Sequence, residues 1–400
     1  MSSIAWLDTS ADEQRRIREV IALFTQKETL DELGIGQIRD AFSDALFPGI
    51  TTIQTRARYF LLVPWAYVKE SRAGRSAAEV RGRVEQSERD LVRTLNRLPQ
   101  QQGVIGARAG AGVKNLPSSI YWNGLLTFAI LRRDTALDQL TGASRVESDG
   151  ADEPASRSVG DWHPTLPAVP DGFPWTLHDG LNMTAAEASW LRERILESVP
   201  DTLLAHIVAA DAPPAGDSPY PWRDPICQDA PDPVARILLH AALFSLTIQG
   251  ATRLYEVLLS EAYEEAGFTT VQSGVEEYHE QFRAWLDDVD DARHQLEAWD
   301  RHDFWNEVRL RSPRVSPRTR LFVDAWTDGL FDGTVHAALE SSASRKLISN
   351  REATMKGRQA RLTNRKLLGQ WGGGGGGGLS YRWATAKRIL SDIHEGLARV

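Results

Sequence analysis

The stretch DPVARILLHAALFSLTIQGATRLYEVL, residues 232–258, decides the expected fold. Asp232 is a residue type that favours the N-cap of a helix, and Pro233 suits the first helical position, where its missing N–H leaves no hydrogen bond unmade. The residues that follow are mostly apolar and contain no further proline. Because a helix that is apolar around most of its circumference is normally buried, this stretch predicts a long core helix.

Helix signals of other kinds recur on both sides of this stretch. Four Ser/Thr-x-x-Glu sequences predict capping boxes, in which a hydroxyl and a carboxylate satisfy exposed amides at a helix start; they begin at Ser10, Thr29, Ser76 and Thr184. Ser316, followed by proline, predicts a further start. Strand signals are sparse, and no alternation of strands and helices supports a parallel sheet. We therefore expect a mainly α, multi-helix protein with two or three helical subdomains and linkers rich in Pro, Gly and Ser.

Breaks in the helical pattern divide the chain of 400 residues into expected domains. Residues 1–140 form an N-terminal helical domain, and residues 181–340 form a central acidic helical domain. Residues 141–180, which are rich in Gly, Ser, Asp and Pro, form a linker or a surface excursion. Residues 341–400 form a basic C-terminal helical region with a poly-Gly hinge at 372–378.

The glycine run lies in WGGGGGGGLSYRW, residues 371–383. A phosphate-binding P-loop needs a lysine and then Ser or Thr after its glycines, whereas Leu379 and Ser380 follow here. A dinucleotide-binding loop needs a preceding strand, whereas the residues before Trp371 indicate helix. Successive glycines are flexible, so we expect a hinge that spans roughly 15 Å.

Charge is distributed unevenly along the chain. Residues 345–400 carry twelve Lys or Arg and three Asp or Glu, a net charge of +9, whereas the remaining residues carry 34 basic and 51 acidic side chains, a net charge of −17. Such asymmetry points to a polyanionic partner or to the protein's own acidic surface. Residues 261–303, with thirteen acids and three arginines, offer such a surface for the tail.

Residues 344–368 hold the strongest candidate binding surface. If this segment is one helix, four of its arginines fall within roughly 80° of the circumference. A basic face with aromatic residues nearby suits contacts with phosphates and stacking on bases. The alternative is an arginine-rich face that is solvated or paired with residues 261–303. The nucleic-acid-binding residues that we predict are Arg351, Lys356, Arg358, Arg361, Arg365, Lys366 and Arg382.

No catalytic residue, metal site or cofactor is predicted. The nine histidines are scattered, and neither His-Glu-x-x-His nor Gly-x-Ser-x-Gly occurs. The single cysteine, Cys227, excludes an internal disulfide and a multi-cysteine zinc site. Asp40 and Asp44, one helical turn apart, are the carboxylates on which a metal-dependent nuclease would be built. Arg56 and Arg58 could pair with these acids instead and form a structural network.

The sequence also predicts a cytoplasmic protein without membrane contact. The longest nearly apolar run, YFLLVPWAYV at residues 59–68, has ten residues, where a membrane span needs about twenty. The start, MSSIAWLDTS, lacks the basic and apolar regions of a signal peptide.

Several stretches together resemble an uncharacterised bacterial protein family of unknown function. They cover most of the chain: SSIAWLDTSADEQRR, DELGIGQIRDAFSDALFPG, QTRARYFLLVPW, LPSSIYWNGL and NREATMKGRQARL. The resemblance implies an association with antiviral defence gene regions, beside helicase-like and nuclease-like genes. It implies no activity and no catalytic residues.

The leading hypothesis is a non-catalytic component of a bacterial DNA-associated system, with antiviral defence as the expected setting. Its basic C-terminal helix would contact DNA or RNA through phosphates, or it would recruit an acidic partner such as another protein of the defence system. Phosphate contacts do not distinguish DNA from RNA, so both remain partners. The alternatives are the metal-dependent nuclease and a scaffold that binds only proteins.

Overall fold

The computed structural model describes residues 32–71, 76–99, 101–132, 161–340, 342–374 and 377–399. Within these ranges the regular structure is helical, apart from an isolated antiparallel bridge between Leu131 and Trp162. The predicted mainly α fold is therefore confirmed. The capping boxes predicted to begin at Ser10 and Thr29 lie outside the described residues.

The chain forms two compact units, each drawn from separated parts of the sequence. The first takes residues up to Ala41 together with Ala242–Leu379, and the second takes Phe42–Ala241 together with Ser380–Val400. The divisions fall inside α2 (Gly36–Leu46) and α9 (Asp232–Glu265), and at the end of the glycine run. The C-terminal region therefore contributes to both units.

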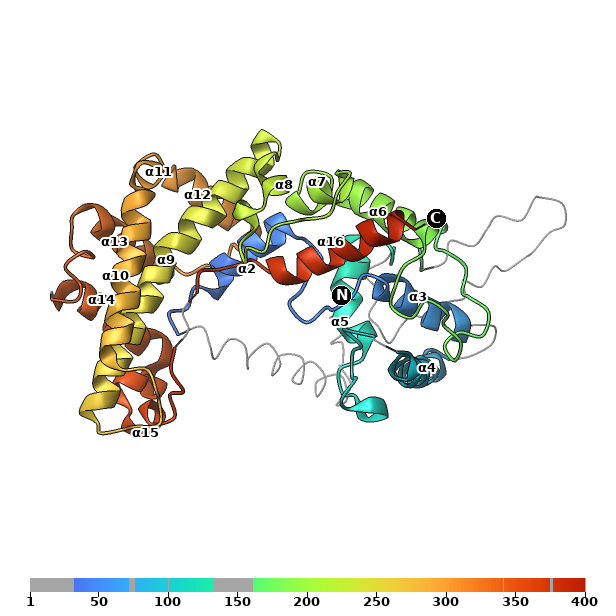
Figure 1. Ribbon diagram of the computed structural model, residues 1–400, viewed down its shortest axis with the longest axis horizontal. Coiled ribbons are helices and arrows are strands. Elements are labelled where there is room, and N and C mark those ends of the chain that lie inside the picture. Colours follow the sequence, from blue (N-terminus) through green and yellow to red (C-terminus); the bar gives the residue numbers. More distant parts are fainter. Residues whose placement is uncertain are drawn as a thin grey trace, which may run out of the picture. The chain divides into compact units, whose positions relative to one another are not determined.

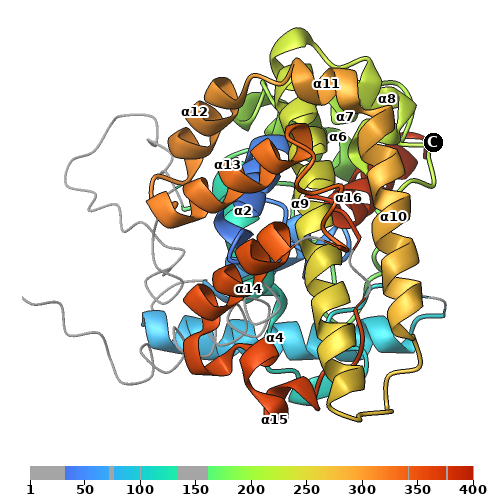
Figure 2. The ribbon, with the colours of Figure 1, turned by 90° about the vertical axis from the view of Figure 1, so that its left-hand side faces the viewer.

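The first unit is built on the C-terminal part of α9, with α10 (Val275–Asp291) antiparallel beside it (Figure 1, Figure 2). Its further elements are α11 (Arg293–Glu297), α12 (Arg301–Arg311), α13 (Pro317–Phe331), α14 (Ser342–Lys356), the 3-10 turns η3 (Gly357–Gln359) and η4 (Arg361–Thr363), and α15 (Arg365–Leu368).

Two tryptophans fix the register of the helices that pack on α9. Trp285 of α10 lies against Gly250, where a Cβ atom would overlap the indole ring. Its Nε1 donates to the carbonyl oxygen of Leu246 at 2.8 Å, and Nε1 of Trp326 on α13 donates to that of Thr247 at 2.8 Å. Because a buried indole N–H needs an acceptor, these two bonds hold α10 and α13 at defined positions along α9.

The second unit ends with α16 (Trp383–Leu397), which packs on α6 (Ala185–Ser198) and α7 (Leu203–Ala209) (Figure 1). Its buried face includes Ile389 and Ile393, which have no exposed surface. The other elements of this unit are α3 (Tyr59–Glu70), α4 (Ala77–Arg97), η1 (Gly110–Gly112), α5 (Pro117–Thr127), η2 (Pro221–Arg223) and α8 (Pro225–Gln228).

Helix α9 begins at Asp232, where the sequence predicts a helix start, and continues past the predicted end to Glu265. Gly267, with φ 74°, follows its last turn, since this left-handed backbone suits glycine. It is the one described helix that is long and apolar enough to cross a membrane. However, 67% of its most apolar window is buried inside the protein, as in the core helix of a soluble protein.

The local helix signals within the described residues are confirmed. Ser76 accepts a hydrogen bond from the amide three residues on, and Ser316 does the same at 3.1 Å. Thr184 Oγ1 accepts from the amide of Glu187 at 3.2 Å, and the Glu187 carboxylate accepts from the amide of Thr184 at 3.0 Å. Each start is formed by side chains within one turn, so the sequence alone identifies it.

The part of the expected linker that the structure describes, residues 161–180, is irregular but packed. Trp162, Phe173 and Leu177 are buried, and Trp65 donates through Nε1 to the carbonyl oxygen of Pro167 at 2.8 Å. These apolar residues anchor the segment in the second unit despite its Gly- and Pro-rich composition. Residues 141–160 of the expected linker lie outside the described residues.

Candidate functional site

The basic segment at residues 344–368 is not one helix, which corrects the prediction. Helix α14 ends just before Gly357, which takes a left-handed φ of 53° and turns the chain. The buried carboxylate of Glu352 holds the new direction, because it accepts from the amide of Arg361 at 2.6 Å and from that of Leu362 at 3.2 Å. The arginines therefore do not share one helical face.

Arg351 is buried, with 5% of its surface exposed. Its Nε donates to the carbonyl oxygen of Leu33 at 2.7 Å, and its second guanidinium nitrogen donates to the carbonyl oxygen of Gly34 at 3.2 Å and to Thr319 Oγ1 at 2.9 Å. The guanidinium also lies 5.0 Å from the ring centre of Phe322. These contacts make Arg351 a structural residue and correct its predicted role as a phosphate contact.

Lys356 and Arg361 share one carboxylate. Lys356 Nζ lies 3.6 Å from Glu32 Oε2, and a terminal nitrogen of Arg361 lies 2.5 Å from Glu32 Oε1. Both cations are therefore paired within the first unit, although the single carboxylate offsets only one of their two positive charges.

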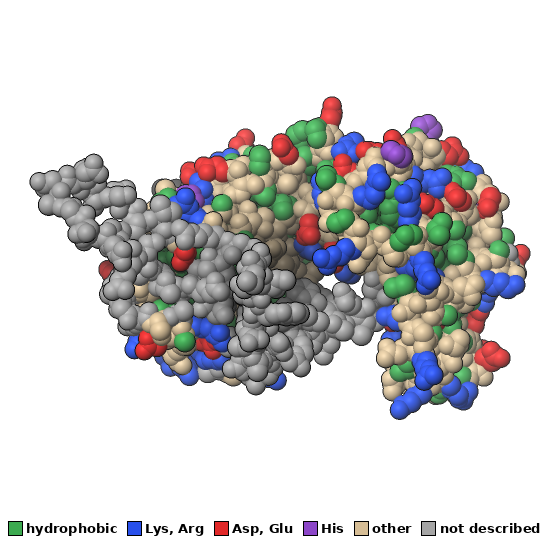
Figure 3. Space-filling model, turned by 180° about the vertical axis from the view of Figure 1, so that it is seen from behind, with side chains coloured by type: hydrophobic (Ala, Val, Ile, Leu, Met, Phe, Trp, Pro, Cys, Tyr) green, Lys and Arg blue, Asp and Glu red, His purple; other side chains and the backbone are tan. Residues whose placement is uncertain are grey.

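Three of the predicted cations remain on the surface, and we call this set the basic end: Arg358, Arg365 and Lys366. Arg358 and Lys366 form no ion pair with a described residue. Arg365 donates to the carbonyl oxygen of Ala266 at 2.7 Å, and its guanidinium lies 5.1 Å from the ring centre of Phe268. Figure 3 shows Lys and Arg side chains at the lower right, in the part of the molecule that holds α15.

Arg382 belongs to the second unit, whereas the basic end belongs to the first. It takes a left-handed φ of 66° immediately before α16. One terminal nitrogen lies 2.5 Å from Asp44 Oδ1 and donates to the carbonyl oxygen of Ile50 at 2.8 Å. The predicted contact of Arg382 with nucleic acid stays a prediction.

The carboxylates of the nuclease alternative are each bound to an arginine. Asp40 accepts from Arg39 Nε at 3.0 Å, and Asp44 pairs with Arg382. Across the residues that the structure describes, no group of three or more His, Cys, Asp or Glu side chains could hold a metal ion.

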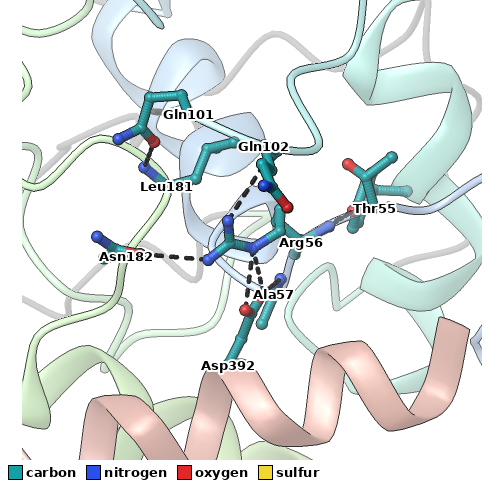
Figure 4. Close-up of polar contacts among 9 residues, drawn as sticks. Thr55, Arg56, Ala57, Gln101, Gln102, Leu181, Asn182 and Asp392 are labelled. Atoms are coloured by element: carbon teal, nitrogen blue, oxygen red, sulfur yellow. Dashed lines mark hydrogen bonds and ion pairs between the residues drawn. The ribbon is translucent and has the colours of Figure 1, made fainter. Parts of the chain in front are cut away.

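Arg56 lies at the centre of a polar network in the second unit (Figure 4). Its Nε contacts both carboxylate oxygens of Asp392 at 2.9 Å, and its terminal nitrogens donate to the carbonyl oxygen of Gln102 at 3.1 Å and to Asn182 Oδ1 at 3.2 Å. The amide of Ala57 donates to Asp392 at 2.8 Å. Burial raises the pKa of Asp392, although the neighbouring Arg56 acts to lower it.

Arg58, two residues further on, is buried and pairs with Glu187 at 2.8 Å. The prediction that Arg56 and Arg58 pair with Asp40 and Asp44 was therefore wrong. Both arginines do form a structural network, but with acids far away in the sequence.

The basic tail meets the start of the predicted acidic surface. Arg345 of α14 pairs with Glu261 of α9, and Glu261 also contacts His279 Nε2 at 3.1 Å. Arg365 adds its hydrogen bond to Ala266. Intramolecular docking on residues 261–303 thus involves Arg345 and Arg365, whereas Arg358 and Lys366 are exposed and have no such contact.

Trp371 and two glycines of the run, Gly373 and Gly374, pack on α9 and α10. Trp371 lies against Tyr263 and Tyr278, with ring centres 5.6 and 5.5 Å apart. The amide of Gly374 donates to the Tyr278 hydroxyl at 3.1 Å, and a Cβ atom there would overlap the carboxylate of Glu256. These glycines therefore permit close packing as well as flexibility. Residues 375–376 of the expected hinge lie outside the described residues.

Comparison with known proteins gives one match, which covers almost the whole chain. A family model described as Family of unknown function (DUF6361) matches residues 1–396. No curated protein and no solved structure matches the chain. The match confirms the predicted resemblance to a family of unknown function along the full length. The chain belongs to the family of unknown function DUF6361.

Proposed function

We propose that this protein is a non-catalytic, cytoplasmic component of a bacterial antiviral defence system and binds nucleic acid through the phosphates. The basic end, Arg358, Arg365 and Lys366, is the surface that we assign to this contact. The observation that carries the proposal is that Arg358 and Lys366 are exposed and form no ion pair with a described residue.

Two acids that contact this part of the chain, Glu352 and Glu32, are already occupied by other groups. Glu352 is buried and occupied by backbone amides and by the Tyr255 hydroxyl at 2.6 Å. Glu32 already pairs with Lys356 and Arg361. A positive surface of this kind attracts phosphates without reading base sequence, so DNA and RNA are both suitable ligands.

The nuclease alternative has weaker support. Asp40 and Asp44 are bound to Arg39 and Arg382, and a metal would have to displace these arginines. A protein-binding scaffold would use the same basic end for an acidic protein surface, and it predicts no salt-dependent binding of nucleic acid.

The test is fluorescence anisotropy with labelled single-stranded DNA, double-stranded DNA and RNA at increasing salt. The double variant Arg358→Glu/Lys366→Glu is compared with Arg83→Glu/Arg97→Glu, which changes the charge equally at exposed positions of α4. We expect at least about tenfold weaker binding for the first variant, and a salt slope smaller by about 0.9 for each phosphate of the duplex that the variant no longer binds.

The control variant should bind as the wild type does. Equally weakened binding in both variants would show that only overall charge matters. A wild-type protein that binds none of the three nucleic acids at low salt would reject the proposal, and a co-purifying acidic protein would then favour the scaffold.

A further inference from the structure

We propose that a cavity on α16, in the second unit, binds a small phosphorylated molecule. The cavity has a volume of about 680 Å³, within the usual size range of small-molecule sites. One wall is the face of α16 that carries Lys387, Arg388 and Ser391, residues that follow one another at helical spacing. The lining also includes Arg56, Gln102 and Gly103. Figure 4 shows Arg56 and Gln102 together with Asp392 of α16.

The positive charges in this cavity are more available than the negative ones. Arg388 is exposed and forms no ion pair with a described residue. Lys387 donates one hydrogen bond, to the carbonyl oxygen of Gly216, and an ammonium group has three donors. Of the two carboxylates, Asp392 is occupied by Arg56 and a backbone amide, which leaves the exposed Glu395 as one negative charge against the two positive charges of Lys387 and Arg388. An anionic ligand therefore fits the lining.

Arg56 is held rigidly before any ligand arrives. Its bonds to Asp392, Gln102 and Asn182 use three of its five N–H groups, which leaves two for a ligand. Gly103, which has a φ of 81°, packs closely on the Arg56 side chain, since a Cβ atom at this position would lie 2.9 Å from Arg56 Cγ. A fixed guanidinium loses little conformational freedom on binding, which favours recognition of a phosphate.

The rest of the lining indicates the kind of phosphorylated molecule. No aromatic side chain lines the cavity as the structure describes it, so nothing there would stack on a nucleobase. Gln102 and Ser391 offer donors and acceptors that suit hydroxyl groups. We therefore assign the site to a phosphorylated polyhydroxy compound of the sugar-phosphate class, a ligand different from the nucleic acid assigned to the first unit.

Isothermal titration calorimetry on the full chain tests this assignment with four probes: ribose 5-phosphate, inorganic phosphate, ribose and adenosine monophosphate. We expect saturable binding of ribose 5-phosphate, weaker binding of phosphate and none of ribose. Arg388→Gln should weaken ribose 5-phosphate binding at least about fivefold, because it removes one charge-assisted hydrogen bond. Arg388 is exposed, so this variant should keep the wild-type melting temperature.

Arg358→Gln, the same change in the first unit, is the matched control and should bind ribose 5-phosphate as the wild type does. Equal binding by Arg388→Gln and the wild type would place the ligand elsewhere and overturn the proposal. The absence of saturable binding by every probe would do the same. Tighter binding of adenosine monophosphate than of ribose 5-phosphate would reject the sugar-phosphate class.

Discussion

Glu88 is a buried carboxyl group whose ionisation sets a pH dependence of stability. Ser118 donates to it twice, from its amide at 2.7 Å and from its hydroxyl at 2.8 Å. Burial nevertheless raises the pKa of Glu88 to about 7 from an ordinary value of 4.5. Between these two pH values the folded protein binds more protons than the unfolded chain, so its stability falls as the pH rises. The full effect of such a shift is about 3 kcal/mol.

Glu88→Gln should remove this dependence. The amide side chain keeps an acceptor for the Ser118 amide and a donor for its hydroxyl, and it carries no charge. We expect the variant to be more stable than the wild type at pH 8 and to lose less stability between pH 5 and pH 8. Melting temperatures at several pH values, measured by circular dichroism, check this. Glu193→Gln, at an exposed position of α6, is the control and should retain the wild-type decline; identical pH profiles for all three proteins would contradict the argument.

We expect substitution by alanine to have opposite effects on stability at Gly250 and at Gly82. Gly250→Ala would place a methyl group where the Trp285 ring lies, and overpacking of this kind costs about 1–3 kcal/mol. Gly82 lies inside α4 with no neighbouring atom within 4 Å, so Gly82→Ala should stabilise the protein by about 0.5–1 kcal/mol. Urea unfolding of both variants measures these changes. A Gly250→Ala protein as stable as the wild type would show that α10 can shift freely on α9.

At the scale of the helix, features formed by neighbouring residues could be predicted from the sequence, and features that depend on distant residues could not. The capping box at Thr184 involves residues three apart, so the sequence is sufficient to place it. The end of α14 also has a local signal in the sequence, because Gly357 favours a helix end. The regular spacing of the arginines, however, predicted one helix that continues past this glycine. The break is held by the buried carboxylate of Glu352. The position of this side chain depends on tertiary packing, which the spacing of residues along the sequence does not reveal.

Thr184→Ala should destabilise the second unit by about 1 kcal/mol, the usual effect of removing an N-cap hydroxyl. The substitution here also affects Glu187, which closes the box and pairs with buried Arg58. Thr184→Ser keeps the hydroxyl and should lie near the wild type in chemical denaturation. Equal destabilisation by both substitutions would mean that the methyl group, and not the cap, supplies the stability.

At the scale of the whole molecule, the sequence predicted the uneven charge but not its local cancellation. Arg56 pairs with Asp392, 336 residues away, and Arg351 donates to Leu33, 318 residues away. No periodicity within a single sequence relates such pairs, because their proximity arises only from folding. Of the predicted basic face, only Arg358, Arg365 and Lys366 are exposed in the first unit. The α16 cavity could not be predicted from the sequence, because it depends on the contact of Arg56 with the distant Asp392.

The pairing of positive side chains with Glu32 predicts a variant that binds nucleic acid more tightly. Glu32 pairs with Lys356 and Arg361, so Glu32→Gln should release two cations beside the basic end. If both reach phosphates, the salt slope for duplex DNA should steepen by up to about 1.8, since each bound phosphate contributes about 0.9. The dissociation constant at low salt should fall at least about threefold for the same reason.

Glu193→Gln makes the same charge change at an exposed position of α6 and should leave both quantities unchanged. Anisotropy titrations at four salt concentrations separate the two variants, because a general change in net charge would affect them alike. If Glu32→Gln binds no more tightly than Glu193→Gln, Lys356 and Arg361 do not reach the nucleic acid. The binding surface would then be limited to Arg358, Arg365 and Lys366, and reversing the charge of Arg358 and Lys366 should remove most of the measured salt dependence.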